Sequence, residues 1–360
     1  MVRMKFSLVA AGLVISAAAC DGAPAPASAE TAAAGEVEVA AAVARPRPPA
    51  TPTVVATAQD QEALDGLLVT GGQVVFGGWR TVERPPEAGG PPFEMVGVLR
   101  TVAAAGGAVE ELWTGNGGVN DIASAPDGLV FLAYDFNSRT GHLNRIPSAG
   151  GAAVELSNWF SHGSSHSLAS DAGVAYWTHS AGASSFVKRT TIADGATVTL
   201  TDSAVIGGSA DNIVFKGGAV YFVSSQAQRT VYGLPAAGSA APVDLYAAPQ
   251  INALAAAPTK PVLFAGAGTT VVAIDLRNGH VRTIFSGTNT IVALAADDDA
   301  VYVGSTDSGT GVGAVTSVRH NGGRAVVLAS GSFTPKPIAV DAASVYWIDS
   351  VARTVSRVAK

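Results

Sequence analysis

Three histidines are the residues best suited to hold a transition metal. Neutral imidazole is a ligand of Zn²⁺ and Cu²⁺, so His162, His166 and His179 could form a metal site if they converged in space. However, His162 and His166 lie in the Ser/Gly-rich segment NWFSHGSSHS, where no helical spacing fixes their geometry. The sequence therefore favours the alternative that these histidines are solvated polar loop residues.

Amide and acid side chains stand at the start of several short apolar segments. The ligand-binding candidates among them are Asn120, Asp121, Asn212 and Asn252, and Asp211 and Asn289 occupy comparable positions. Carboxylate and amide oxygens suit Ca²⁺, which takes about six to eight of them. The alternative is that Asn and Asp hydrogen-bond to loop backbone where strands begin.

A long loop is the third candidate for recognition. The segment from Gly77 to Gly97, GGWRTVERPPEAGGPPFEMVG, carries Trp79, Arg80, Arg84 and Phe93 between prolines. A loop of this length is often functional when the rest of the chain has short connections. The alternative is a tolerated insertion, because exposed loops also vary freely.

No catalytic constellation accompanies these residues. The sequence contains no Ser-His-Asp order, no phosphate-binding glycine loop and no CxxC motif. No nucleophile and base can be recognised as a pair, so the sequence favours binding over catalysis, and binding requires no cofactor.

The elements that position these residues are repeated along the chain. Seven Val-aromatic segments recur at intervals of 38 to 55 residues, with Phe76, Phe131, Tyr176, Tyr221, Phe264, Tyr302 and Tyr346 as markers. Glycine turns such as Gly106-Gly107 and Gly322-Gly323 follow, each leading into a further apolar strand. This is the period of a four-stranded propeller blade.

The seventh unit lacks its outer strand. The segment Thr51–Asp60 is strand-like and belongs to no other blade, so we expect it to pair with the third strand around Thr354–Ala359. The sequence therefore predicts an all-β, seven-bladed β-propeller over residues 51–360, with velcro closure by the N-terminal strand. Closure of this kind removes a free sheet edge.

Two tetrapeptides carry a family resemblance. YWTH at residues 176–179 and YWID at 346–349 resemble the YWTD motif, and the whole repeat is similar to bacterial secreted YWTD/NHL-like propeller lipoproteins. The resemblance implies a ligand site on the face that holds the loops before the inner strands. Calcium-dependent lactonases with propeller folds use a comparable acid and amide cluster, although the chain has no matching motif with a dedicated glutamate.

The N-terminal 50 residues predict export and anchoring. Residues 1–19 have Arg3 and Lys5 before a short apolar run, which is typical of a signal peptide. Ala17-Ala18-Ala19-Cys20 resembles a lipobox, so we expect a lipid on Cys20. Residues 20–50 are rich in Ala and Pro and contain no aromatic residue, which predicts a disordered tether.

The amino-acid composition limits the classes of molecule that the protein is expected to bind. Hydrophobic residues make up 48% of the chain and charged residues 14%, with a net charge of −6 and no Lys/Arg-rich block, so nucleic acid is not an expected partner. The leading interpretation is an extracytoplasmic binding or scaffolding protein that is lipid-anchored to a bacterial membrane, in the periplasm or at the cell surface. We expect a monomer that binds a protein or small molecule on its loop face. The alternative is a metal-dependent, lactonase-like hydrolase with its site at the channel mouth.

Overall fold

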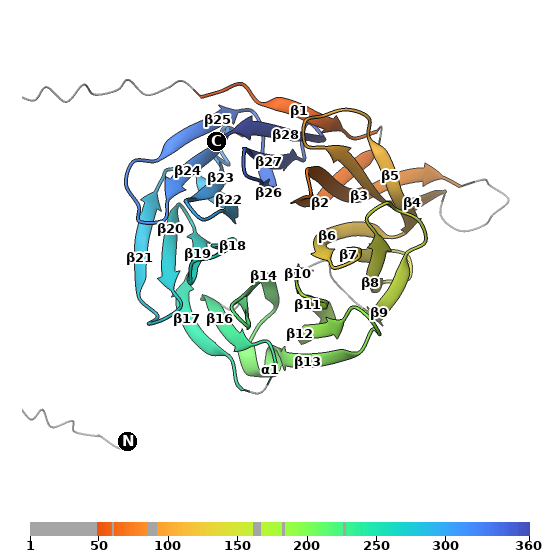
Figure 1. Ribbon diagram of the computed structural model, residues 1–360, viewed down its shortest axis with the longest axis horizontal. Coiled ribbons are helices and arrows are strands. Elements are labelled where there is room, and N and C mark those ends of the chain that lie inside the picture. The colour runs from red at the N-terminus through yellow and green to blue at the C-terminus, as the bar shows by residue number, and fades with distance from the viewer. Residues whose placement is uncertain are drawn as a thin grey trace, which may run out of the picture. The chain divides into compact units, whose positions relative to one another are not determined.

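The described part of the chain folds into a ring of seven sheets. The computed structural model describes residues 49–59, 61–84, 92–160, 167–181, 184–225, 228–238 and 240–360. In these residues each sheet has four antiparallel strands, and the sheets are arranged around a central axis (Figure 1). The predicted seven-bladed β-propeller is therefore confirmed.

Blades 1 to 3 are formed by consecutive strands. Blade 1 contains β2 (Glu62–Thr70), β3 (Gln73–Glu83), β4 (Phe93–Ala103) and β5 (Glu110–Asn116). Blade 2 contains β6 (Gly118–Ala125), β7 (Gly128–Asp135), β8 (Thr140–Pro147) and β9 (Val154–Phe160). Blade 3 contains β10 (Leu168–Asp171), β11 (Val174–Ala181), β12 (Ser184–Thr191) and β13 (Thr197–Asp202), and the short helix α1 (Ser203–Ile206) follows it.

Blades 4 to 6 repeat this order. Blade 4 contains β14 (Ala210–Lys216), β15 (Ala219–Ser224), β16 (Arg229–Pro235) and β17 (Val243–Ala248). Blade 5 contains β18 (Ala253–Ala256), β19 (Val262–Ala267), β20 (Thr270–Asp275) and β21 (Val281–Ser286). Blade 6 contains β22 (Thr290–Ala296), β23 (Ala300–Thr306), β24 (Gly313–Arg319) and β25 (Val326–Gly331).

Blade 7 joins the two ends of the propeller. It contains β26 (Pro335–Val340), β27 (Ser344–Asp349) and β28 (Thr354–Ala359), and its outer strand is β1 (Thr53–Thr57). Thr53 pairs with Arg357 and Thr57 pairs with Thr354, so the predicted velcro closure by pairing with the third strand is confirmed. Figure 1 shows β1 alongside β28.

Apolar side chains between neighbouring blades form the core. The marker aromatics of six blades are buried, namely Phe76, Phe131, Tyr176, Phe264, Tyr302 and Tyr346. Each lies in the second strand of its blade, where both faces of the sheet are covered by adjacent blades. Tyr302 and Tyr346 also donate their hydroxyl protons to Asp297 and Asp341, at 2.8 Å in both blades.

Arginines of the third strands join several blades. Arg145 Nη1 donates to the Ile192 carbonyl of the next blade at 3.3 Å, and Arg189 Nη1 donates to the Ala236 carbonyl at 3.5 Å. Arg357 donates to the Ala104 carbonyl, which joins blade 7 to blade 1. These bonds fasten the outer parts of neighbouring sheets where the 3–4 turns meet.

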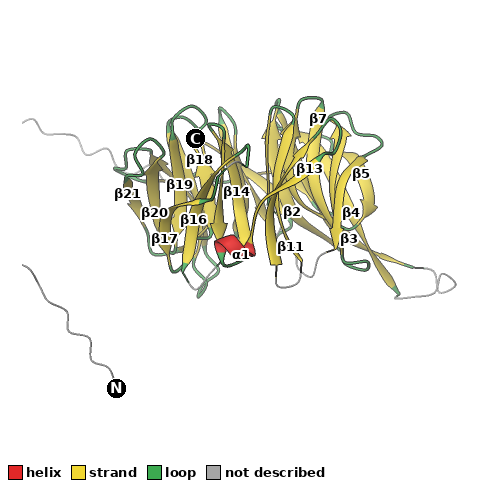
Figure 2. Ribbon diagram, turned by 90° about the horizontal axis from the view of Figure 1, so that it is seen from below, coloured by secondary structure: helices red, strands yellow, loops and turns green. Residues whose placement is uncertain are grey.

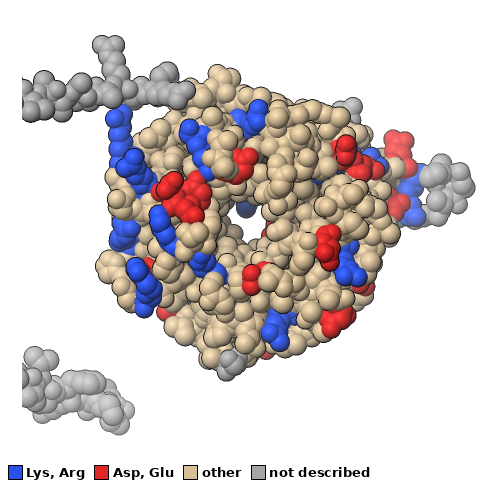
Figure 3. Space-filling view, viewed as in Figure 1, with Lys and Arg blue, Asp and Glu red and all other residues tan. Residues whose placement is uncertain are grey.

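The propeller has two unlike faces. We call the face that holds the loops before the inner strands, together with the 2–3 turns, the loop face; α1 and the β3–β4 hairpin lie there (Figure 2). The 1–2 and 3–4 turns form the opposite face. Figure 3 shows this opposite face and the opening at the centre of the ring, with side chains of both charges around it.

Candidate functional site: the channel mouth

Polar side chains from six blades surround one cavity at the loop-face end of the central channel. The cavity has a volume of about 510 Å³. Its lining residues are Asp65, Asn120, Asp121, Ser167, Asp211, Asn212, Arg229, Asn252, Val292, Lys336 and Pro337. The volume is that of a site for a small ligand. We call this site the channel mouth.

Breaks in strand register place most of these residues. The pairing of β2 with β3 skips Asp65, and the pairing of β6 with β7 skips Asn120. Comparable breaks occur at Asn212, Val292 and Lys336-Pro337 in the inner strands of blades 4, 6 and 7. A β-bulge leaves its extra residue unpaired and turns its side chain away from the regular alternation. Bulges therefore direct side chains toward the mouth.

Asp121 is held by two backbone hydrogen bonds. Its Oδ1 accepts the Ile122 N–H at 2.9 Å, and its Oδ2 accepts the Leu168 N–H at 2.8 Å. Leu168 begins β10, so this carboxylate connects blade 2 to blade 3. Burial raises the pKa of Asp121 to about 7, against the lowering effect of both hydrogen bonds, and the negative charge of Asp65 adds to the increase.

Other lining residues also connect neighbouring blades. Asn120 Nδ2 donates to Asp65 Oδ2 at 3.4 Å, and Ser167 Oγ accepts the Ile213 N–H at 2.9 Å. Asn252 Nδ2 donates to the Ile291 carbonyl at 3.0 Å. The alternative expectation, that Asn and Asp hydrogen-bond to backbone where strands begin, therefore holds for part of the site. Asp121 and Asn252 bond to backbone groups of the next blade, namely the Leu168 N–H and the Ile291 carbonyl.

Two cations stand among these acids. Arg229 Nη1 donates to the Ile251 carbonyl at 2.9 Å, while Lys336 extends from the bulge of β26 and is exposed. Partial burial raises the pKa of Asp65, and the Asn120 hydrogen bond and the positive charge of Lys336 oppose this increase. The mouth therefore contains charges of both signs.

The structure brings part of the predicted binding set together. Asn120, Asp121, Asn212 and Asn252 all line the channel mouth, as does Asp211. Asn289 is not among the lining residues. Their role as ligand contacts stays a prediction, but they converge on one cavity.

The aromatic and basic residues of the long loop lie elsewhere. Trp79 packs against blade 2, where its ring centroid is 6.0 Å from that of Phe136. Arg84 Nε is 3.5 Å from Glu94 Oε2, and Phe93 is 50% exposed on the same hairpin. Among the described residues, Arg80 Nη1 donates a long hydrogen bond of 3.5 Å to Gln59 Oε1. None of these four residues lines the channel mouth, and residues 85–91 of the loop lie outside the described residues.

The histidine prediction can be placed only in part. His179 is 3% exposed, and its ring centroid is 4.9 Å from that of Phe186 and 5.3 Å from that of Trp177. The ring therefore belongs to an aromatic stack within blade 3, and because His179 is a buried residue of β11, the expectation of a solvated loop residue is wrong for it. His162 and His166, like Cys20, lie outside the described residues. Among the residues that the structure describes, no group of three His, Cys, Asp or Glu side chains could hold a metal ion.

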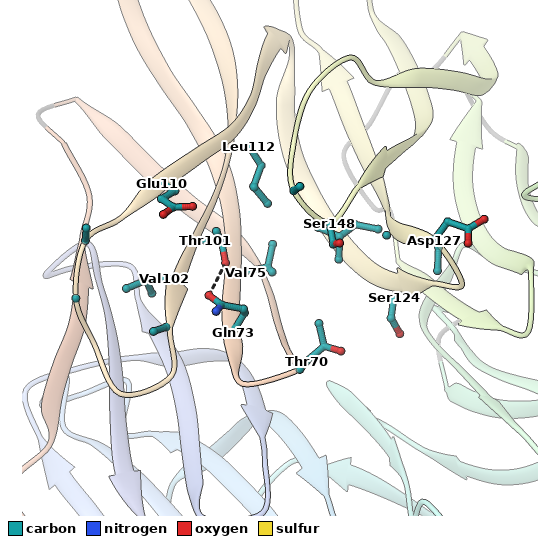
Figure 4. A pocket seen from close by; sticks show the side chains of 18 of the residues that line it. Thr70, Gln73, Val75, Thr101, Val102, Glu110, Leu112, Ser124, Asp127 and Ser148 are labelled. Atoms are coloured by element: carbon teal, nitrogen blue, oxygen red, sulfur yellow. Dashed lines mark hydrogen bonds between the residues drawn. The ribbon is translucent and has the colours of Figure 1, made fainter.

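A larger groove lies on the opposite face, between blades 1 and 2. Its volume is about 880 Å³, and it is lined by turns that include Gly106, Gly107 and Pro126. Figure 4 shows Gln73 and Thr101 hydrogen-bonded to each other within it, at 3.3 Å. Glu110 and Asp127 are its charged lining residues, so the groove lacks the mixed charges of the channel mouth.

Four polar residues that line the mouth were not predicted from the sequence: Asp65, Ser167, Arg229 and Lys336. Asp65 and Asn120 occupy equivalent positions in their blades. Asp65 stands two residues before Leu67, the partner of the marker Phe76. Asn120 stands two residues before Ile122, the partner of the marker Phe131. Counting back from each marker aromatic would have found Asp65. Arg229 had no such signal, because it belongs to a third strand.

The comparisons with solved structures return propellers. A catalytically inactive virginiamycin B lyase from Staphylococcus aureus, solved with quinupristin, is 14% identical, with a TM-score of 0.59 over 86% of this chain and 99% of that chain. The propeller domain of the trilobed protease from Pyrococcus furiosus is 10% identical, with a TM-score of 0.58 over 84% and 93%. Sqt1 from Saccharomyces cerevisiae is 10% identical, with a TM-score of 0.54 over 88% and 99%.

These likenesses show the fold alone. The chain is an all-β propeller with distant structural similarity to proteins of unlike function. The Pyrococcus domain is described as having an open velcro topology, whereas β1 closes blade 7 here. No family model matches the chain, and no curated protein matches it. Membership of the YWTD/NHL group therefore stays a prediction.

Proposed function

We propose that this protein is an extracytoplasmic, lipid-anchored binding protein that holds a small polar ligand at the channel mouth and does not catalyse a reaction. The observation that carries this proposal is the convergence of bulged inner-strand residues on one cavity. A bulge interrupts the ladder, and natural proteins often use bulges to aim side chains at functional sites. Their recurrence around the channel supports a ligand there.

Binding fits the carboxylates better than metal-dependent hydrolysis does. Both oxygens of Asp121 already accept backbone N–H groups, so this carboxylate is occupied in holding blades 2 and 3 together. A pKa near 7 would suit a general acid or base, but the neighbouring Ser167 hydroxyl already accepts the Ile213 N–H, which joins blade 3 to blade 4. The described residues also hold no group of three His, Cys, Asp or Glu side chains that could bind a metal ion. Elemental analysis of the purified protein tests this alternative: one equivalent of bound Ca²⁺ or Zn²⁺ would favour the hydrolase.

The proposal is tested by filling the cavity. Val292 lines the mouth and is half-buried, so Val292→Trp should block it without changing its charge. Val327 is 42% exposed on the outer strand of the same blade, and Val327→Trp is the matched control. A thermal-shift screen of amino acids, sugars and nucleosides should find a ligand that raises the Tm by several degrees at about 100 times Kd.

The screen has two decisive outcomes. Loss of the shift in Val292→Trp, with retention in Val327→Trp, supports binding at the mouth. A ligand that shifts both variants equally binds elsewhere, and that result contradicts the proposed site.

A further inference from the structure

Charged groups of both signs border the channel mouth. Asp65, Asp121 and Asp211 stand on blades 1, 2 and 4, while Lys336 extends from blade 7 and Arg229 from blade 4. Within the described ranges, neither Lys336 nor Arg229 forms an ion pair with any carboxylate.

Lys336 and Asp65 interact electrostatically, although they do not form an ion pair. They come from adjacent blades, and the charge of Lys336 lowers the pKa of Asp65. Asp65 accepts one hydrogen bond, the 3.4 Å bond from Asn120. Both side chains are exposed, so they keep hydrogen-bonding capacity for a ligand.

Arg229, on blade 4, also keeps hydrogen-bond donors that could bind a ligand. One Nη1 hydrogen bond to the Ile251 carbonyl fixes the guanidinium, which has five N–H donors in total. A guanidinium with spare donors is a good partner for a carboxylate.

We infer that the ligand of the channel mouth is a compact zwitterion, such as an amino acid or a short peptide, with its ammonium group at Asp65 and its carboxylate at Arg229 or Lys336. This inference rests on the function proposed above. A ligand with charge of one sign would leave the opposite charges of the rim desolvated and unmatched, which costs binding free energy. The amides of Asn120, Asn212 and Asn252 can both donate and accept, so they serve either end of such a ligand.

The test uses matched sets of compounds and calorimetry on the full chain. The probes are the twenty common L-amino acids and L-alanyl-L-alanine, each with its N-acetyl and C-terminal amide derivatives, together with the uncharged polyols glycerol and sorbitol. At least one zwitterion should bind, and removal of either charge from it should weaken binding by at least tenfold.

Variants of the charged lining residues test the protein side. Asp65→Asn should weaken zwitterion binding by at least tenfold, and so should either Arg229→Met or Lys336→Met, according to which cation holds the carboxylate. The charge-conserving exchange at that cation, Arg229→Lys or Lys336→Arg, should retain most of the binding, and full binding in both methionine variants would contradict the inference. Asp127→Asn and Lys260→Met are the charge-matched controls, because both residues are exposed and neither lines the mouth. An unchanged thermal unfolding midpoint confirms that each variant is folded.

The outcomes separate this inference from the proposed function. If a polyol or a singly charged derivative binds as well as the zwitterion, and Val292→Trp blocks it, the inference is overturned while binding at the mouth stands. If no probe binds and the broader screen also finds no ligand, both are contradicted.

Discussion

At the scale of single residues, Asp121 combines a structural task with an unusual ionisation. Its carboxylate connects the starts of β6 and β10, and its position in the wall of the channel mouth raises its pKa to about 7. Because the folded pKa lies above the unfolded value near 3.8, folding favours the protonated form. The resulting stabilisation is complete below about pH 3.8 and is lost as the pH rises to about 7.

This gives a prediction for the pH dependence of stability. The free energy of unfolding of wild type, measured relative to that of Asp121→Asn, should fall between pH 4 and pH 7 and be level above pH 7. Urea unfolding across this range measures the difference. Comparing the two proteins cancels the contribution of Asp65, whose pKa is also raised. A difference that is independent of pH would contradict the assignment of a raised pKa to Asp121.

How much of the site could be predicted from sequence depended on how each residue is positioned. Asn120 and Asn252 were found because polar residues at strand starts stand out against apolar repeats. Asp65 was hidden, because the segment EALDGLLV reads as one regular strand until the bulge is known. Loop length and residue type singled out the segment from Gly77 to Gly97, but much of it extends β3 and β4 as a hairpin. The packing of Trp79 against blade 2 depends on tertiary contacts that no local pattern reveals.

At the scale of elements, β1 is the strand that closes the ring, and its two valines have different environments. Val54 is 54% exposed and Val55 is 7% exposed, in keeping with the alternation of adjacent side chains between the two faces of a strand. Val55 packs in the core between blades 7 and 1, in a cluster with Phe76 and Tyr346. The alternating pattern could be read from the sequence, but which valine is buried could not, because a bulge follows Val54.

We therefore expect unequal effects of one substitution at two adjacent positions. Val55→Asp should destabilise the propeller by about 3 kcal/mol or more, because it buries an unpaired carboxylate. Val54→Asp should change stability by about 0.5 kcal/mol or less, since the side chain stays in water. Chemical denaturation measures both. Equal losses in the two variants would mean that β1 is not seated in blade 7 as described.

At the scale of the whole molecule, the sequence repeat predicts the fold of the propeller but not how the propeller is attached to a membrane. The markers and glycine turns specified seven blades because each blade repeats one hydrophobic pattern. No helix in the described residues is long and apolar enough to cross a membrane. Membrane attachment through a lipid on Cys20 is a proposal that rests on the lipobox-like sequence.

The anchor is tested by Cys20→Ser. In a bacterial host, wild type should partition with membranes, and globomycin, which inhibits cleavage of lipoprotein precursors, should accumulate the uncleaved chain. Cys20→Ser should move the protein from the membrane fraction to the soluble fraction. Membrane partitioning that is identical in the variant and the wild type would refute lipidation.

The pairing of β1 with β28 also constrains how the molecule reaches its native state. Thr53 and Arg357 are partners at opposite ends of the propeller sequence, so the contact that completes blade 7 is among the least local in the chain. During synthesis β1 emerges first and waits without its partner until β28 has been made. Closing so long a loop is slow, and contacts of high sequence separation retard folding. Ring closure is therefore expected to be a late folding event, and until then β28 presents an open edge to other chains.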